Sequence, residues 1–220
     1  MDGSDAGVRV QVTGAARRLH EATAALDALS RRREFLRELH EKGNWLATGR
    51  PPADPPAWVQ RWSEYWESLK ADPEYQRLQV EAAAAREALH TPEFESALEL
   101  LQLGDNSGLA YAIAYLEADP WYFRSGYLKG RIARWLRQVE LTAEHCDRLR
   151  NVILAGLRKG SRYEQVEYRR LARRLDTEAF RRELRVLAGS PDAGVARRAA
   201  LVLRACELND APGRDLRGAR

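Results

Sequence analysis

GRIARWLR, residues 130–137, returns in altered form as YRRLARRLD, residues 168–176. Both stretches carry the order Arg, aliphatic, Ala, Arg, bulky residue, Leu, so that 131–136 aligns with 170–175 at an offset of 39 residues. A looser copy, ARRAALVLR, occupies residues 196–204. Self-similarity at about 40 residues is typical of proteins built from stacked helix pairs. The pattern therefore predicts a repetitive, helical second half of the chain.

Helix starts are marked by Ser, Thr or Asp followed at once by Pro. A side-chain oxygen at this position accepts from a free backbone N–H, and Pro at the first helical position needs no donor. Thr142 and the pair Asp176-Thr177 carry the same cap without Pro. No segment shows the sustained alternation of a strand, so the chain is predicted to be all-α. The starts that contain Pro are Asp54-Pro55, Asp72-Pro73, Thr91-Pro92, Asp119-Pro120 and Ser190-Pro191.

The segment SPDAGVARRAALVLRACEL, residues 190–208, resembles the second helix of a HEAT repeat. A turn with Pro and Asp precedes Val195, and Arg and Ala follow at helical spacing. The resemblance covers about half of the chain and implies an α-solenoid of HEAT-like antiparallel helix pairs over residues 92–210. The expected pairs are 107–118 with 120–138, 142–158 with 162–175, and 177–188 with 191–207.

An N-terminal helical region is expected to precede the repeats and to cover residues 1–91. Apolar residues at helical spacing predict a long helix over about 8–42, with Leu19, Leu26, Leu29, Leu36 and Leu39 on one side. The prolines of residues 48–57 predict a loop. Residues 211–220 are expected to form a flexible tail.

Three tryptophans follow the predicted loop. Trp58, Trp62 and Trp66 are spaced four residues apart, which stacks their indoles along one helix face. Packing against other helices is favoured over an exposed binding platform.

The charge is distributed unevenly along the chain. Residues 1–120 carry 13 Lys and Arg against 20 Asp and Glu, a net charge of −7, whereas residues 121–220 carry 23 against 12, a net charge of +11. This asymmetry favours either a basic surface for an acidic partner or two halves that attract each other. Arginine outnumbers lysine 32 to 4, as expected of a GC-rich bacterial genome, so codon usage explains part of the arginine excess.

Much of the positive charge falls on the second helix of each expected pair. At 100° per residue, the arginines of residues 169–174 lie opposite an apolar arc that includes Leu171 and Leu175. Second helices of HEAT solenoids tend to line the concave side, so the resemblance implies a basic groove. Such a groove suits phosphates or another acidic partner; a merely solvated or ion-paired face is the alternative. The expected partner-binding residues are Arg124, Arg131, Arg134, Arg169, Arg170, Arg173, Arg174 and Arg197.

The sequence contains few candidates for a catalytic or cofactor-binding motif. The sequence has no phosphate loop, no dinucleotide-binding glycine pattern and no HExxH, so no cofactor or metal is expected. Glu87 and His90 form one Glu-x-x-His, whereas a di-iron bundle needs two. Two cysteines are too few for a disulfide framework. Without a leader-like or membrane-spanning stretch, a cytoplasmic protein is expected.

Three functions remain open. A non-enzymatic interaction or scaffold module, whose basic surface binds a protein or other acidic partner, is favoured because it requires nothing beyond the predicted fold. A nucleic-acid-binding HEAT-like protein is the alternative. An enzyme similar to the alkylpurine DNA glycosylases, which also use HEAT-like repeats and a basic groove, is less favoured. In that reading Asp119, Trp121 and Trp135 take the acidic and aromatic roles.

Overall fold

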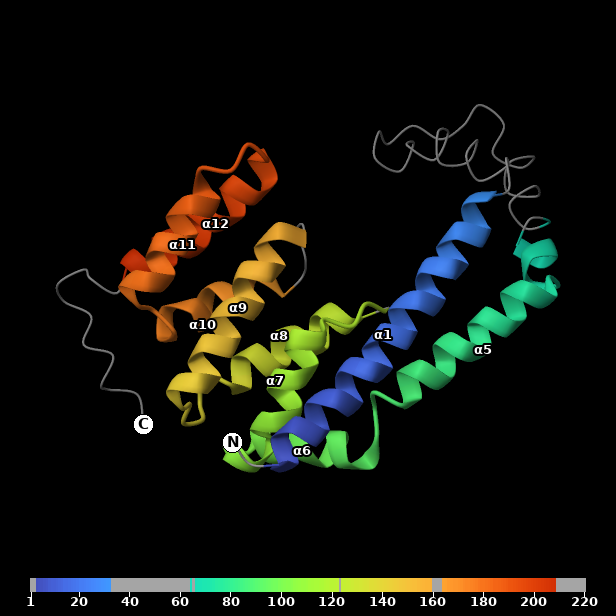
Figure 1. The fold of residues 1–220 in the computed structure, drawn as a ribbon, viewed down its shortest axis with the longest axis horizontal. Helices are drawn as coiled ribbons and strands as arrows, with labels where there is room; N and C mark the ends of the chain where they lie inside the picture. Colours follow the sequence, from blue (N-terminus) through green and yellow to red (C-terminus); the bar gives the residue numbers. More distant parts are fainter. Residues whose placement is uncertain (1–2, 33–63, 65, 123, 160–163, 209–220) are drawn as a thin grey trace. The chain divides into compact units, whose positions relative to one another are not determined.

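The computed structural model describes residues 3–32, 64, 66–122, 124–159 and 164–208. Over these residues the chain is helical and contains no strand, which confirms the all-α prediction for this part (Figure 1). The predicted loop, Trp58, Trp62 and the tail lie outside the described residues. The elements are α1 (Gly3–Arg32), α5 (Pro73–Glu87), α6 (Pro92–Gln102), the 3₁₀ helix η1 (Asn106–Gly108), α7 (Leu109–Ala118), α8 (Ser125–Trp135), α9 (Ala143–Lys159), α10 (Gln165–Arg174), α11 (Glu178–Ala188) and α12 (Ala193–Glu207).

Four of the predicted helix starts are confirmed by their hydrogen bonds, among them Thr142, whose hydroxyl accepts from the backbone N–H of His145 in the first turn of α9. Asp72 accepts from two backbone N–H groups of the first turn of α5, with Pro73 as the first helical residue. Thr91 and Thr177 cap α6 and α11 in the same way. These caps satisfy donors that have no partner within the helix.

Two predicted starts are wrong in position. Asp119 adopts a left-handed conformation with φ 47° and ends α7, and α8 begins only at Ser125. Because Pro disfavours the right-handed helical region for the residue before it, Asp119-Pro120 stops a helix here. At the other site α12 begins at Ala193, because Asp192 rather than Ser190 caps it.

The chain divides into two compact units. Unit 1 comprises Met1–Thr13 and His90–Arg220, and unit 2 comprises Gly14–Leu89. None of the described helices is long and apolar enough to cross a membrane.

In unit 1, some of the packed pairs of described helices join elements two apart in the chain, and others join neighbours. Helix α7 packs against α9, α8 against α10, and α10 against α12, while α6 packs against α7 and α11 against α12. Each helix contributes an apolar stripe to the core, such as Tyr168, Leu171 and Ala172 of α10. Gly108 is required where η1 meets α6, since a Cβ there would lie 2.0 Å from the Ala97 carbonyl oxygen.

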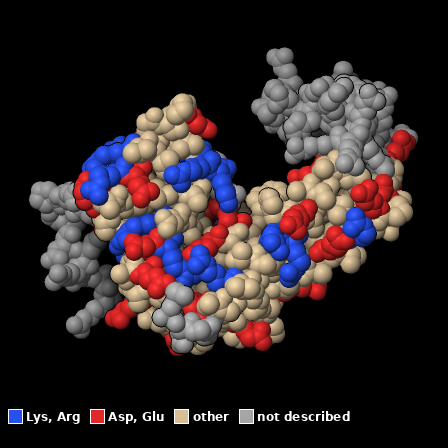
Figure 2. All heavy atoms as spheres, viewed as in Figure 1, with Lys and Arg blue, Asp and Glu red and all other residues tan. Residues whose placement is uncertain are grey.

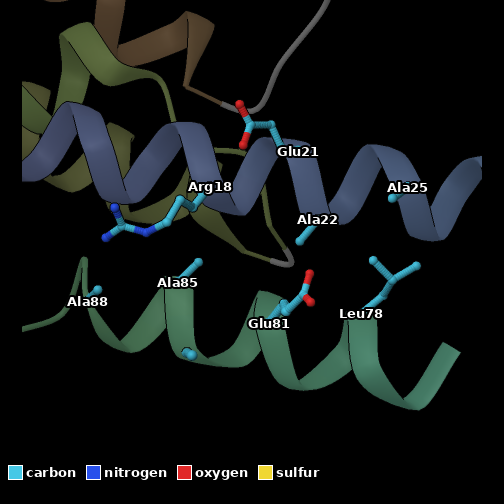
Figure 3. A pocket seen from close by; sticks show the side chains of 9 residues that line it. Arg18, Glu21, Ala22, Ala25, Leu78, Glu81, Ala85 and Ala88 are labelled. Atoms are coloured by element: carbon cyan, nitrogen blue, oxygen red, sulfur yellow. The ribbon is translucent and has the colours of Figure 1, made fainter. Parts of the chain in front are cut away.

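In unit 2, α1 and α5 flank a gap with a volume of about 560 Å³. Its walls are largely alanine, and Figure 3 shows the short side chains of Ala22, Ala85 and Ala88 between the two helices, while Glu21 points away. The described surface of these two helices mixes both signs of charge (Figure 2). Besides alanine and Leu78, the lining contains Arg18, Glu21 and Glu81, so its charged groups are few and of both signs.

A buried ion cluster holds the end of α7. The Lys129 side chain is only 1% exposed, and its Nζ donates to Asp119 Oδ1 at 2.6 Å. Lys159, half exposed, donates to Asp119 Oδ2 at 2.7 Å. Both oxygens of the carboxylate therefore bind lysine, and the cluster joins the end of α7 to α8 and α9.

Replacing Asp119 by Asn should destabilise the protein strongly. Asn tolerates the left-handed backbone but removes the negative charge of Asp119 from beside the buried Lys129 ammonium, and breaking a buried ion pair typically costs about 3 kcal/mol or more. Urea denaturation followed by circular dichroism measures the loss. As the control, Lys159→Ala should cost under about 1 kcal/mol because Lys159 is half exposed. A loss below about 1 kcal/mol for D119N would contradict this account.

Stability at high pH should depend on Cys206. Burial raises the pKa of its thiol to about 12 from an ordinary value of 9.0. Because the folded pKa is the higher one, the neutral thiol contributes stability that is present below pH 9 and is lost as pH rises toward 12. The free energy of unfolding, measured from about pH 8 to about pH 11, should therefore fall more steeply for the parent than for Cys206→Ala. Parallel curves would contradict the prediction.

Candidate functional site

The candidate site is a groove between α10 and α12. It has a volume of about 410 Å³ and lies in a part of unit 1 where Lys and Arg gather (Figure 2). Each helix contributes residues at positions i, i+3, i+4 and i+7, which is one continuous face of a helix. The lining residues are Val166, Arg169, Arg170 and Arg173 from α10, and Leu201, Arg204, Ala205 and Leu208 from α12.

Apolar side chains stand among these arginines. Val166, Leu201 and Leu208 are 46%, 41% and 48% exposed. The sequence pattern does not predict their exposure, because helical periodicity assigns the apolar residues of each helix to one buried face. The signal was present, since Leu201 lies outside the buried arc of α12 that contains Ala199, Val202 and Cys206.

The arginines of the groove differ in how they are held. Within the described residues, Arg169 and Arg204 form no ion pair, so their guanidinium groups are available to a partner. Arg170 donates to Glu167 Oε1 at 2.7 Å but remains half exposed. The lining contains no acidic residue, so the groove as a whole is basic.

Glu167 organises the floor beside the groove. Its side chain is only 10% exposed, and Arg134 of α8 and Arg137 of the turn after it approach its two oxygens at 3.3 Å and 3.4 Å, while Arg170 approaches from α10. The positive charge of Arg134 is therefore partly compensated. The face predicted to be a row of solvent-facing arginines is in part an interhelical ion cluster.

Arg174 is occupied in a different way. Its guanidinium nitrogens donate to the carbonyl oxygens of Leu136, which caps α8, and of Val139 in the turn that follows. An arginine that binds the last carbonyls of a helix satisfies their lone pairs and the negative end of the helix dipole. It does not line the groove, so the expected strip 169–174 is divided between groove and helix end.

The other predicted arginines are not part of the groove lining. Arg131 stacks on Trp135 of its own helix, with 4.8 Å from the guanidinium carbon to the ring centroid. Arg124 is exposed at the start of α8 in a left-handed conformation with φ 70°. Arg197 lies on α12 one turn before Leu201 and so extends the face that lines the groove.

No metal site is evident in the described part of the chain, where no three His, Cys, Asp or Glu side chains gather. His90 of the Glu-x-x-His motif binds Glu95 rather than completing a site with Glu87: its Nδ1 lies 2.7 Å from Glu95 Oε1, and its Nε2 lies 2.8 Å from the Tyr122 hydroxyl. Tyr122 continues to the buried Tyr115 hydroxyl at 2.6 Å. Burial raises the pKa of Tyr115 far above its ordinary value, so this hydroxyl keeps its proton.

Comparison with protein-family models, curated proteins and solved structures gave no match. The geometry of the groove is therefore the basis for the function proposed below.

The different roles of the arginines predict different costs of truncation. Arg174→Ala removes donors to two carbonyl oxygens and should cost about 1–3 kcal/mol in the free energy of unfolding. Arg169→Ala should change it by less than about 0.5 kcal/mol. Chemical denaturation of both variants under the same conditions compares them directly. Equal losses would show that Arg169 also stabilises the fold.

Proposed function

We propose that the chain is a non-enzymatic interaction module of HEAT-like architecture that binds an acidic, partly apolar protein segment in the groove between α10 and α12. The coexistence of free arginines and exposed aliphatic side chains in one groove carries the proposal.

The order of packing supports the HEAT-like architecture. In an array of stacked helix pairs, each helix packs against the helix two positions further along the chain. Helices α7, α8 and α10 have such partners in α9, α10 and α12. The groove then lies between successive helices of one layer, where α-solenoids bind extended partners.

The composition of the groove favours a protein over a nucleic acid. Arginine is enriched at protein interfaces, and aliphatic groups such as Leu201 and Leu208 gain free energy when a partner removes them from water. A phosphate backbone offers little apolar surface to cover them. Glutamate and leucine side chains on one segment would satisfy both kinds of group.

Nucleic-acid binding remains the second candidate function. The groove is lined by positive side chains from both helices, Arg169 and Arg173 of α10 and Arg204 of α12. Arg197 continues the basic face along α12. A phosphate backbone could follow this line of arginines.

An enzyme of the glycosylase type finds less support. That reading requires an acidic residue that is free to act, whereas Asp119 accepts from Lys129 and Lys159 with its two oxygens. Trp135 is stacked beneath Arg131.

The proposal predicts selective binding of an acidic amphipathic peptide. A fluorescent helical peptide with Glu and Leu on one face should bind more tightly than polyglutamate of equal charge, because it also covers the apolar groups. Fluorescence anisotropy across a salt series measures both, with labelled duplex DNA and single-stranded RNA alongside. Tighter binding of nucleic acid, with a slope of log Kd against log salt of about 0.9 per duplex phosphate contact, would instead favour the second candidate.

A variant of the groove tests where the peptide binds. Arg169→Glu/Arg204→Glu should weaken peptide binding at least tenfold while leaving the helical spectrum unchanged. Arg86→Glu/Arg182→Glu changes the net charge equally, and its two exposed positions lie outside the groove. This control should bind as the parent does. Equal weakening in both variants would mean that net charge, not the groove, attracts the peptide.

A further inference from the structure

A second exposed face in unit 1 has the composition that the groove requires. Two leucines of α6, Leu100 and Leu103, are 39% and 83% exposed. Leu103 is the most exposed of the large apolar side chains among the described residues. Leu100 and Leu103 lie one turn apart, so together they place a continuous apolar surface in water that a partner can cover.

Acidic residues flank these leucines. Glu99 lies on the same face of α6, Glu93 and Glu95 lie on either side of it, and all three are exposed. Within the described residues Glu99 forms no ion pair. The outer face of α6 is thus an apolar centre with carboxylates at its edges.

The two faces match in length as well as in chemistry. Ser96, Glu99, Leu100 and Leu103 occupy positions i, i+3, i+4 and i+7, and the stripes of α10 and α12 have the same spacing. At 1.5 Å per residue, each stripe extends about 10 Å. A helix with this face can place its leucines against Val166, Leu201 and Leu208 and its carboxylates near the arginines.

Within one chain, the outer face of α6 and the α10–α12 groove do not contact each other. Helix α6 packs against η1, α7 and α8, whereas the groove lies between α10 and α12. Figure 1 shows α6 and α12 at opposite ends of unit 1. A copy of the chain that offers its α6 can therefore be bound only by another copy.

We propose that the chain associates head to tail, with the outer face of α6 from one copy seated in the α10–α12 groove of the next. The inference rests on the proposed function, because it makes a second copy the acidic segment that the groove binds. Charge supports it at the level of the whole chain, since residues 1–120 carry −7 and residues 121–220 carry +11. An interface between two different faces leaves one of each unused, so association continues until a ring closes or a filament grows.

Sedimentation velocity and light scattering on the full chain test the proposal. The parent should show a mass that rises with protein concentration above the 25.0 kDa of one chain. An α6 variant, Glu99→Arg/Leu103→Arg, and the groove variant, Arg169→Glu/Arg204→Glu, should each remain monomeric. The positions in the α6 variant are exposed, so circular dichroism and urea denaturation should match the parent.

Mixing the two variants gives the decisive result. The α6 variant keeps an intact groove and the groove variant keeps an intact α6, so an equimolar mixture should form a heterodimer and nothing larger. A mixture that stays monomeric, or either variant that associates as the parent does, would overturn the head-to-tail interface. Should a double variant fail to fold, Leu103→Ala and Arg204→Ala replace it, with at least tenfold weaker self-association expected of each.

The same measurements separate this inference from the proposed function. If the parent remains monomeric at every concentration but binds the Glu/Leu peptide in its groove, the self-association is wrong and the interaction module stands. If it neither associates nor binds the peptide, both are wrong.

Discussion

The last carbonyl groups of an α-helix have no partner within the helix, and in unit 1 arginines from neighbouring helices bind several of them. Arg174 of α10 donates to Leu136 at the end of α8 and to Val139 in the turn that follows, and Arg150 of α9 donates to Leu175 at the end of α10. Arg198 of α12 donates to Leu157 in the last turn of α9. Each contact also places a cation at the negative end of a helix dipole. The contacts fix the ends of helices to one another and so set the spacing on which the groove depends.

This use of arginine changes how the composition should be interpreted. An arginine excess can indicate polyanion binding or codon usage, but here a share of it supplies donors to buried carbonyls and counter-charge to Glu167 and Asp176. Lysine would serve less well in these places, because a planar guanidinium can bind two acceptors at once. The arginines that a partner could contact are those that line the groove. They are fewer than a count of positive residues suggests.

Local chemistry made part of the fold predictable. Caps such as Asp72 and Thr91 are encoded within four residues, so the starts of α5 and α6 followed from the sequence alone. Asp119-Pro120 carries the same letters but follows a helix, and its carboxylate binds Lys129 and Lys159 from elsewhere in the chain instead of capping a new helix. Those lysines lie 10 and 40 residues away, beyond the reach of a local pattern.

The candidate site was predictable only in part for the same reason. Helical periodicity placed the arginines of residues 169–174 on one face, but whether each meets solvent, a carboxylate or a carbonyl depends on which helix packs beside it. Arg169 and Arg174 look equivalent on a helical wheel, yet Arg169 lines the groove and Arg174 caps α8. The apolar members of the groove escaped because periodicity assigns one buried face to a helix, whereas α12 has a second, half-exposed one.

That second face bears directly on what the surface binds. A helix that served only as a solvated edge of unit 1 would lose nothing by replacing Leu201 and Leu208 with polar residues, and exposed leucines carry a risk of aggregation. Arginines around these leucines lower the risk of aggregation, because the basic faces of two copies repel each other. An acidic face is not repelled in this way. Under the proposed function, a basic rim around an apolar centre would disfavour neutral and basic apolar surfaces and favour acidic ones. The exposed face of α6, with leucines flanked by glutamates, is such a surface within the same chain.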